Sequence, residues 1–382
     1  MGLFDKFKNK KEEKEYDGFY HLDDILERNA VYNMIFGERS SGKTYACLEY
    51  ALKKHCETGE RFAYLRRWDE DFRGKRGTSL FDALVKNGLV EKYSHGEYNS
   101  IDYWSGRFYL CKVDKEKMTR VKSPDPFGYA FGLSTMEHDK SSSYPLITTV
   151  IFDEFITRTT YLPDEFVLFQ NTLSTIIRDR DNVKVFMLGN TVNQFCPYFR
   201  EMGLKHVKGM SPGDINLYIS GKDKRLRIAV EFTGGERIRS EKPSDFYFAF
   251  DNPNLQMITN GEWELGMYPH LYPSHSYKSK DIRLTYYIEF EGEVIRCDVI
   301  KIDKNIITYC HRQTRDIKDE HKHLYYSLTQ TIKPNYRVRI DRPSSEIEQF
   351  IYSQFKYNNV YYEDNEVGDI IMNYIQTCIQ MK

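Results

Sequence analysis

The first two hundred residues alternate short apolar runs with amphipathic stretches. Four runs are rich in β-branched and aromatic residues and have the length of buried strands, at residues 30–36, 61–68, 146–155 and 183–191. Between them, residues 45–54 and 164–178 carry apolar side chains at helical spacing. Buried strands separated by helices predict an α/β domain with a mostly parallel sheet over residues 30–200.

The pattern changes beyond residue 200. Residues 201–277 are punctuated by glycine and proline and are predicted to form a linker subdomain. Residues 278–382 are predicted to form a smaller α+β C-terminal domain. It would contain a hairpin over 284–302 that turns at 291–293, a strand at 305–310, and helices at 344–355 and 366–380. Residues 1–29 form a charged arm and a short lead-in helix in this interpretation.

A glycine-bounded loop follows the first predicted strand. It consists of Gly37, Glu38, Arg39, Ser40, Ser41, Gly42, Lys43 and Thr44. The two glycines allow backbone conformations in which successive N–H groups surround a polyanion at the start of the next helix. Lys43 would contact the β- and γ-phosphates and act in catalysis, and Thr44 would coordinate Mg²⁺. The order strand, loop, helix therefore predicts binding of ATP with Mg²⁺.

Polar residues end two of the later strands. Asp153 and Glu154 close the third run, where Asp153 would hold Mg²⁺ through water and Glu154 would act as general base. Asn190 and Thr191 close the fourth run, where they would sense the γ-phosphate or the attacking water. More than a hundred residues separate Thr44 from Asp153. That spacing suits the additional-strand (ASCE) class of P-loop NTPases.

Arg66 and Arg67 end the second run. Their position suits three roles that the sequence leaves open: a contact to phosphate, a contact to a neighbouring subunit, or a salt-bridged surface.

Composition limits the classes of protein to which the chain can belong. The chain has 382 residues, 40% of them hydrophobic and 29% charged, as in soluble globular proteins of about two domains. It contains neither an apolar run of membrane-spanning length nor a signal-peptide core near its start, so we expect a cytosolic protein. The seven cysteines form no CxxC pair, which argues against a disulfide framework and a zinc ribbon. A net charge of −1 means that a polyanionic partner must bind to a local basic patch.

The loop with Arg39 inside it, the Asp153–Glu154 pair, the two arginines and the Gly189-Asn190-Thr191 tip together resemble the DNA-packaging ATPases of tailed bacteriophages. The resemblance spans about residues 30–197. It is greatest to the encapsidation ATPases of small short-tailed phages, which are related to terminase large subunits. It implies ATP-driven translocation of double-stranded DNA into a procapsid by a ring, a pentamer in the small-phage members, at the portal (connector) vertex in the host cytoplasm. Whether a structural RNA or a terminal protein takes part is left open.

The same resemblance implies that the C-terminal domain is a degenerate RNase H-like nuclease. Its acids do not form a clear metal-ligand set by spacing, so nuclease activity is not expected; they are Asp298, Asp303, Asp341, Asp364 and Asp369. Residues 301–342 contain ten Lys and Arg against five acids. This excess fits contacts to DNA phosphates, and it also fits a solvated surface of mixed charge.

In a ring, an arginine of the neighbouring subunit would stabilise the transferred phosphoryl group. Arg178 and Arg180 are the candidates, with Arg158 behind them, and each is also compatible with a surface ion pair. Two other functions share the phosphate loop. One is a helicase or DNA-partitioning ATPase that is not coupled to a capsid, and the other is a nucleotide-binding module or kinase that does not move DNA.

Overall fold

The computed structural model describes residues 19–39, 41–114, 116–136, 144–157, 161–178, 180–191, 195–220, 226–234, 267–271, 277–302, 305–329 and 331–381. The chain divides into two compact units. The first comprises residues 1–159 and 166–263, and the second residues 160–165 and 264–382. Each unit is described by itself.

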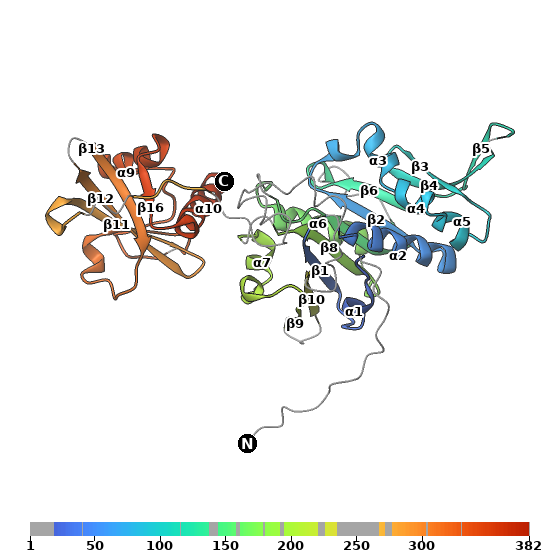
Figure 1. Cartoon of the computed structure of the whole chain (residues 1–382), viewed down its shortest axis with the longest axis horizontal. Helices are drawn as coiled ribbons and strands as arrows, with labels where there is room; N and C mark the ends of the chain where they lie inside the picture. The colour runs from blue at the N-terminus through green and yellow to red at the C-terminus, as the bar shows by residue number, and fades with distance from the viewer. Residues whose placement is uncertain are drawn as a thin grey trace, which may run out of the picture. The chain divides into compact units, whose positions relative to one another are not determined.

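The first unit is built on one large sheet (Figure 1). Its strands lie in the order β3-β4-β6-β2-β7-β8-β1-β10-β9, and β5 pairs with β4. The bounds are β1 Tyr32–Gly37, β2 Arg61–Arg66, β3 Ser100–Trp104, β4 Arg107–Asp114, β5 Thr119–Lys122, β6 Gly128–Gly132, β7 Ile147–Asp153, β8 Lys184–Asn190, β9 Ile215–Ser220 and β10 Leu226–Thr233. The run from β6 to β10 is parallel. Strand β8 separates β1 from β7, as the additional-strand class requires, so the predicted P-loop NTPase fold is confirmed.

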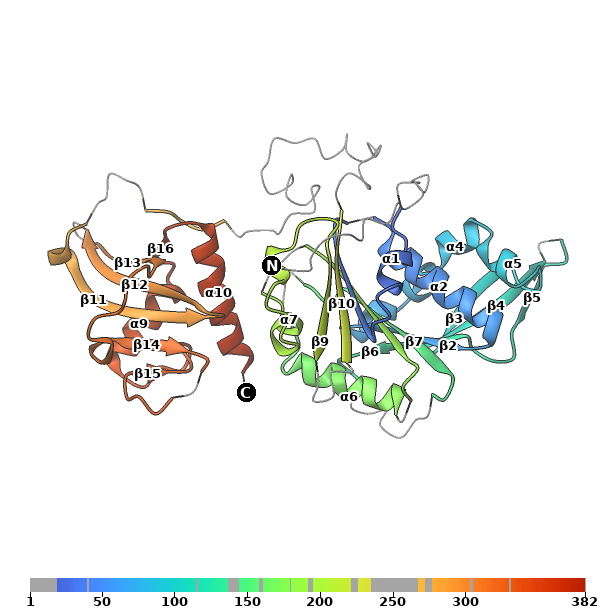
Figure 2. The same cartoon turned by 90° about the horizontal axis from the view of Figure 1, so that it is seen from below.

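Helices cover both faces of this sheet. Helix α2 (Lys43–Thr58) lies on one face and α6 (Glu165–Ile177) on the other, as Figure 2 shows. Neighbouring residues of β7 serve the two layers: Ile151 belongs to the core cluster beneath α2, and the ring of Phe152 stacks on Phe169 of α6 at 5.2 Å. A strand buried on both sides needs apolar residues at most positions, which explains the apolar run of β7; Thr148 and Thr149 are the polar residues buried within it. The shorter helices are α1 Asp23–Leu26, α3 Lys75–Ser79, α4 Asp82–Lys86, α5 Leu89–Tyr93 and α7 Pro197–Glu201.

One predicted boundary is wrong. The ATPase domain was expected to end at residue 200, yet β10 pairs in parallel with β1 from Tyr32↔Ile228 to Gly37↔Thr233, and β9 pairs with β10. Strand β1 thus has β8 on one side and β10 on the other. Every backbone group of this buried strand needs a partner, and β10 supplies those on the second side. The sheet therefore includes strands from the stretch that was assigned to a linker subdomain.

The second unit has a mixed sheet of order β15-β14-β11-β12-β13-β16. Strands β11, β12 and β13 form the antiparallel meander that was predicted. Strand β14 lies parallel to β11, a pairing that the sequence did not predict, and the likeness to RNase H stays a prediction. The tight turn between β11 and β12 lies at Glu291 and Gly292, both with positive φ, close to its predicted place. The bounds are β11 Ile282–Phe290, β12 Glu293–Ile302, β13 Asn305–Arg312, β14 Leu324–Ser327, β15 Tyr336–Arg337, α9 Glu346–Lys356, β16 Val360–Tyr362 and α10 Asn365–Gln380.

Within the described part of the chain, no helix has the length and apolar character needed to cross a membrane. Across the same residues, no three or more His, Cys, Asp and Glu side chains gather closely enough to hold a metal ion. All seven cysteines are free thiols.

Candidate active site

The phosphate loop joins β1 to α2. At Gly37 φ is +147°, and a Cβ there would lie 2.4 Å from the carbonyl oxygen of Thr233, so only glycine fits. Gly42 has φ of +94° and forms the N-cap of α2. The Nζ atom of Lys43 donates to the carbonyl oxygen of Glu38 at 2.5 Å and to Oγ of Ser41 at 3.2 Å. The ammonium group therefore lies over the loop that would receive phosphate. Ser40 lies outside the described residues.

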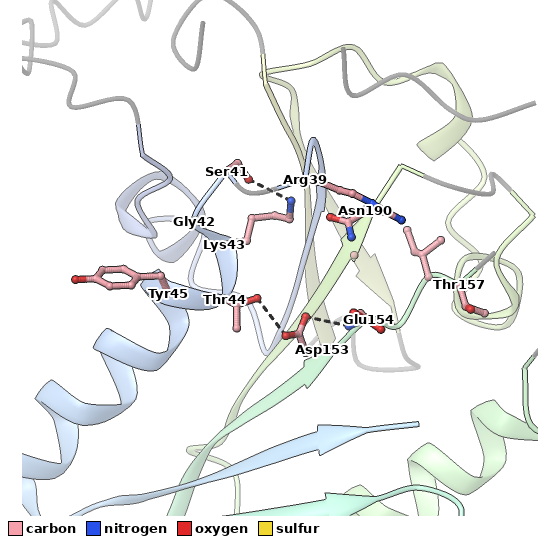
Figure 3. A pocket seen from close by; sticks show the side chains of 12 residues that line it. Arg39, Ser41, Gly42, Lys43, Thr44, Tyr45, Asp153, Glu154, Thr157 and Asn190 are labelled. Atoms are coloured by element: carbon pink, nitrogen blue, oxygen red, sulfur yellow. Dashed lines mark hydrogen bonds between the residues drawn. The ribbon is translucent and has the colours of Figure 1, made fainter. Parts of the chain in front are cut away.

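The two predicted acids lie opposite this loop. The hydroxyl of Thr44 donates to Oδ2 of Asp153 at 3.1 Å, and Oδ1 of Asp153 accepts the backbone N–H of Glu154 at 3.0 Å (Figure 3). Glu154 has φ of +60°, and its side chain is 57% exposed. Oxygen ligands of this kind suit Mg²⁺, so Thr44 and Asp153 fit the role of holding the metal of Mg-ATP.

A cavity of about 640 Å³ contains these groups. The side chain of Arg39 extends across it toward Asn190 and Thr157, whereas Tyr45 points away from them (Figure 3). The structure thus brings together the loop, both acids and the tip of β8, as the sequence predicted. The lining residues are Arg39, Ser41, Gly42, Lys43, Thr44, Tyr45, Asp153, Glu154, Ile156, Thr157, Gly189 and Asn190.

Arg66 forms ion pairs with both Asp153 and Glu154. Its guanidinium is 2.8 Å from Oε2 of Glu154 and 3.7 Å from Oδ2 of Asp153, and it also pairs with Asp71. Burial by itself lowers the pKa of Arg66, but the charges of Asp153 and Glu154 outweigh burial and raise that pKa above its ordinary value. Of the three roles left open by the sequence, the structure shows the salt-bridged one for Arg66, with Asp71 and the two acids at the end of β7 as its partners.

Tyr64 was missed by the sequence reasoning. Its hydroxyl donates to Oδ2 of Asp153 at 2.5 Å, and burial, followed by the charge of Asp153, raises the pKa of Tyr64 so that it keeps its proton. The sequence could have indicated this contact, because Tyr64 lies two residues before Arg66, and residues two apart on a strand share one face of the sheet.

The two candidate trans arginines do not complete this edge of the sheet. Arg180 follows α6, where its Nε donates to the carbonyl oxygen of Ile177 at 3.0 Å. Other donors of the same guanidinium contact the carbonyls of Ile176 and Pro145, and Pro145 precedes the start of β7, at the end remote from Asp153. Helix α6 thus carries Arg180 to the edge of the sheet opposite the phosphate site of its own chain, so it does not act on that site within one subunit. The action of Arg178 and Arg180 on a neighbouring chain stays a prediction, and Arg158 lies outside the described residues.

The basic stretch of the second unit is locally neutralised. Arg312 lies within ion-pair distance of Asp364, Glu363 and Glu366. Further pairs join Lys322 to Asp319, Lys333 to Glu320, Arg337 to Glu348 and Arg339 to Asp341. The excess of positive charge counted along the sequence thus overstates the charge offered to DNA, and phosphate binding by this unit stays a prediction.

The sequence model of the family described as Podovirus DNA encapsidation protein (Gp16) matches residues 14–218, more than half of the chain. The chain belongs to this family. The DNA packaging protein of Bacillus phage B103 is 31% identical over 183 residues, which is 47% of this chain and 50% of the relative. That of Bacillus phage phi29 is 28% identical over 184 residues, 47% of this chain and 49% of the relative. The chain thus spans about half the length of these curated relatives.

Two solved structures share the fold of this family member. A chain of the bacteriophage Phi-29 viral genome packaging motor assembly aligns over 95% of this chain and 99% of its own length, with a TM-score of 0.53 and 20% identity. The Phi-28 gp11 DNA packaging motor aligns over 94% and 98%, with a TM-score of 0.51 and 17% identity. At these identities the likeness concerns the fold alone.

Proposed function

We propose that this encapsidation-family protein is an ATPase that drives double-stranded viral DNA into a procapsid. One observation carries the ATPase part: the Thr44 hydroxyl, at the end of the phosphate loop, lies 3.1 Å from the carboxylate of Asp153, with Glu154 next in the chain. Family membership and the names of the matching relatives, DNA packaging proteins of Bacillus phages, support the DNA-packaging part.

The geometry supports the following role for each residue of the site. Backbone N–H groups of residues 37–44 bind the phosphates, and Lys43 exchanges its two contacts within the loop for the β- and γ-phosphates. Thr44 and Asp153 hold Mg²⁺, which neutralises charge on the phosphates when bound. Glu154 accepts a proton from the attacking water. Because Arg66 holds the same carboxylate, this step requires their ion pair to open.

The proposal extends to assembly. The protein acts as a homo-oligomeric ring, a pentamer by analogy with small-phage packaging ATPases, on the portal of the procapsid. An arginine from the neighbouring subunit, Arg178 or Arg180, stabilises the transferred phosphoryl group, and the second unit contacts the DNA backbone.

Glu154→Gln tests the ATPase chemistry. The variant should bind ATP as the wild type does and hydrolyse it roughly 10²–10⁴-fold more slowly, because the amide cannot take the proton. Lys43→Ala should instead lose ATP affinity. Binding measured with a fluorescent ATP analogue and turnover measured by phosphate release separate the two, and near-normal turnover by Glu154→Gln would remove that residue from catalysis.

Packaging is distinguished from the alternative helicase function by its dependence on the capsid. With procapsids that carry a portal, ATP turnover should rise and added DNA should become resistant to nuclease. If the protein instead separates DNA strands without a portal and protects no DNA, the helicase is the better description.

Mixed rings test the neighbouring arginine. Arg178→Ala and Lys43→Ala proteins, each inactive alone, should regain partial ATPase activity when combined, since one subunit then supplies the arginine and the other the loop. Arg180 also contacts carbonyls at the end of α6, so an Arg180→Ala subunit needs a folding control by circular dichroism. Absence of rescue with either arginine variant counts against both.

A further inference from the structure

We propose that Arg67 is a positioning residue that fixes the backbone from which Glu154 reaches the attacking water. The inference rests on the proposed function, in which Glu154 activates that water. It concerns the residue after β2, which neither the phosphate loop nor the acids include. Arg67 also differs from its neighbour Arg66, which contacts the carboxylate of Glu154 and not its backbone.

Arg67 is bound to the turn that carries Glu154. One terminal nitrogen of its guanidinium donates to the carbonyl oxygen of Glu154 and the other to that of Phe155, each at 3.1 Å. Arg67 is only 5% exposed, and its own carbonyl oxygen accepts the backbone N–H of Ser134 at 3.2 Å. On the other side of the turn, the N–H of Phe155 donates to the carbonyl oxygen of Leu188 in β8 at 3.1 Å. The turn is therefore held between β2 and β8.

The turn needs this support because of its conformation. Glu154 adopts φ of +60°, the left-handed region, which costs a residue with a side chain about 1–2 kcal/mol. Relaxation to a negative φ would swing the side chain away from the cavity that it now lines. The planar guanidinium presents two N–H donors at fixed spacing, which match two successive carbonyl oxygens. A lysine ammonium is a point charge and does not reproduce this fork.

Loss of the two hydrogen bonds from Arg67 should slow ATP hydrolysis and leave ATP binding unchanged. A displacement of about 1 Å in a catalytic group can cost on the order of 10²-fold in rate. We expect Arg67→Met to lower kcat by about that factor. Arg67 is not among the residues that line the cavity, so ATP affinity should stay within about three-fold of wild type. Arg61→Met is the matched control. Arg61 lies at the other end of β2, where it contacts Tyr129 and Asp125, and its loss should leave kcat unchanged.

A double-mutant cycle in single-turnover hydrolysis tests whether Arg67 acts through Glu154. If it does, Arg67→Met should add less than about two-fold to the loss caused by Glu154→Gln, because the positioned group is already absent. Multiplicative losses would overturn the inference, since Arg67 would then act elsewhere. A Glu154→Gln protein that hydrolyses ATP normally defeats the proposed function itself. An inactive Glu154→Gln protein beside a fully active Arg67→Met protein defeats only the inference about Arg67.

Arg67→Lys keeps the test decisive if the methionine variant does not fold. It retains the buried cation and loses the paired contact, and its fold is checked by a circular-dichroism melt. We expect a folded Arg67→Lys protein to bind ATP normally and to turn over at least ten-fold more slowly than wild type. Wild-type turnover by that folded protein would show that the fork has no part in placing Glu154.

Discussion

Replacing Glu231 by glutamine should change how the stability of the first unit depends on pH. Glu231 lies on β10 beside β1, and its Oε2 accepts the hydroxyl of Tyr20 at 2.6 Å. Burial raises the pKa of this carboxyl to about 7, against a smaller lowering by the Tyr20 hydrogen bond. The charge of Asp24 raises the pKa further, and that of Arg28 lowers it.

The magnitude follows from the two pKa values. The carboxyl titrates at 4.5 in the unfolded chain and at about 7 in the folded one. At 1.36 kcal/mol for each pH unit, the difference corresponds to about 3 kcal/mol. Because the folded pKa is the higher one, the folded state binds more protons between these values. The contribution to stability is therefore fully present below pH 4.5 and is lost as the pH rises through about 7.

Urea unfolding followed by circular dichroism from pH 4.5 to 8 measures this loss. Glutamine does not titrate, so the free energy of unfolding of Glu231→Gln relative to wild type should increase by about 3 kcal/mol across that range. Glu57→Gln is the control: Glu57 is 59% exposed on its side chain, and the variant should follow the wild-type profile. Parallel profiles for wild type and Glu231→Gln would refute the reasoning, because they would mean that Glu231 titrates alike in both states.

Three further predictions follow from contacts in the two units. Arg66→Met removes a cation that competes with Mg²⁺ for the carboxylate of Asp153. The half-saturating Mg²⁺ concentration for ATP binding should therefore fall roughly five-fold, and a rise would contradict this. Gly128→Ala would place a Cβ 1.9 Å from the ring of Phe62 and should lower the free energy of unfolding in urea by about 1–3 kcal/mol or more. Gly209→Ala, whose Cβ would meet no atom within 4 Å, should be nearly neutral. Equal losses in the two variants would refute the packing argument. Burial raises the pKa of Asp298, but hydrogen bonds from His311, Thr285 and Arg296 outweigh it and lower that pKa to about 2. Wild type should therefore lose about 2 kcal/mol of stability as the pH falls from about 4 through 2. An Asp298→Asn protein with the same acid profile would contradict this.

The central sheet and the phosphate site were predictable because they are encoded locally. A buried parallel strand is an apolar run, and the residues at its carboxyl end are its neighbours in sequence, so Thr44, Asp153 and Asn190 were found without the structure. Pairing between strands far apart in the chain leaves a weaker pattern in the sequence than a buried strand does. Paired residues of β1 and β10, such as Tyr32 and Ile228, are 196 positions apart in the chain, and the alternating pattern of β10 resembles that of a half-exposed strand. Nor does the sequence show that α6 returns Arg180 to the far edge, or that Arg312 meets acids about fifty residues later.

The order of strands also determines how the loop and the arginine pair are connected. Helix α2 begins at Lys43 in the phosphate loop and ends at Thr58, and β2 begins at Arg61, so one crossover joins them. In the sheet, β2 and β1 are separated by β7 and β8. The last residue of β2 and the one after it hold, respectively, the carboxylate and the backbone of Glu154. A nucleotide that moves α2 as a rigid body would therefore act on Glu154 through a single helix and strand.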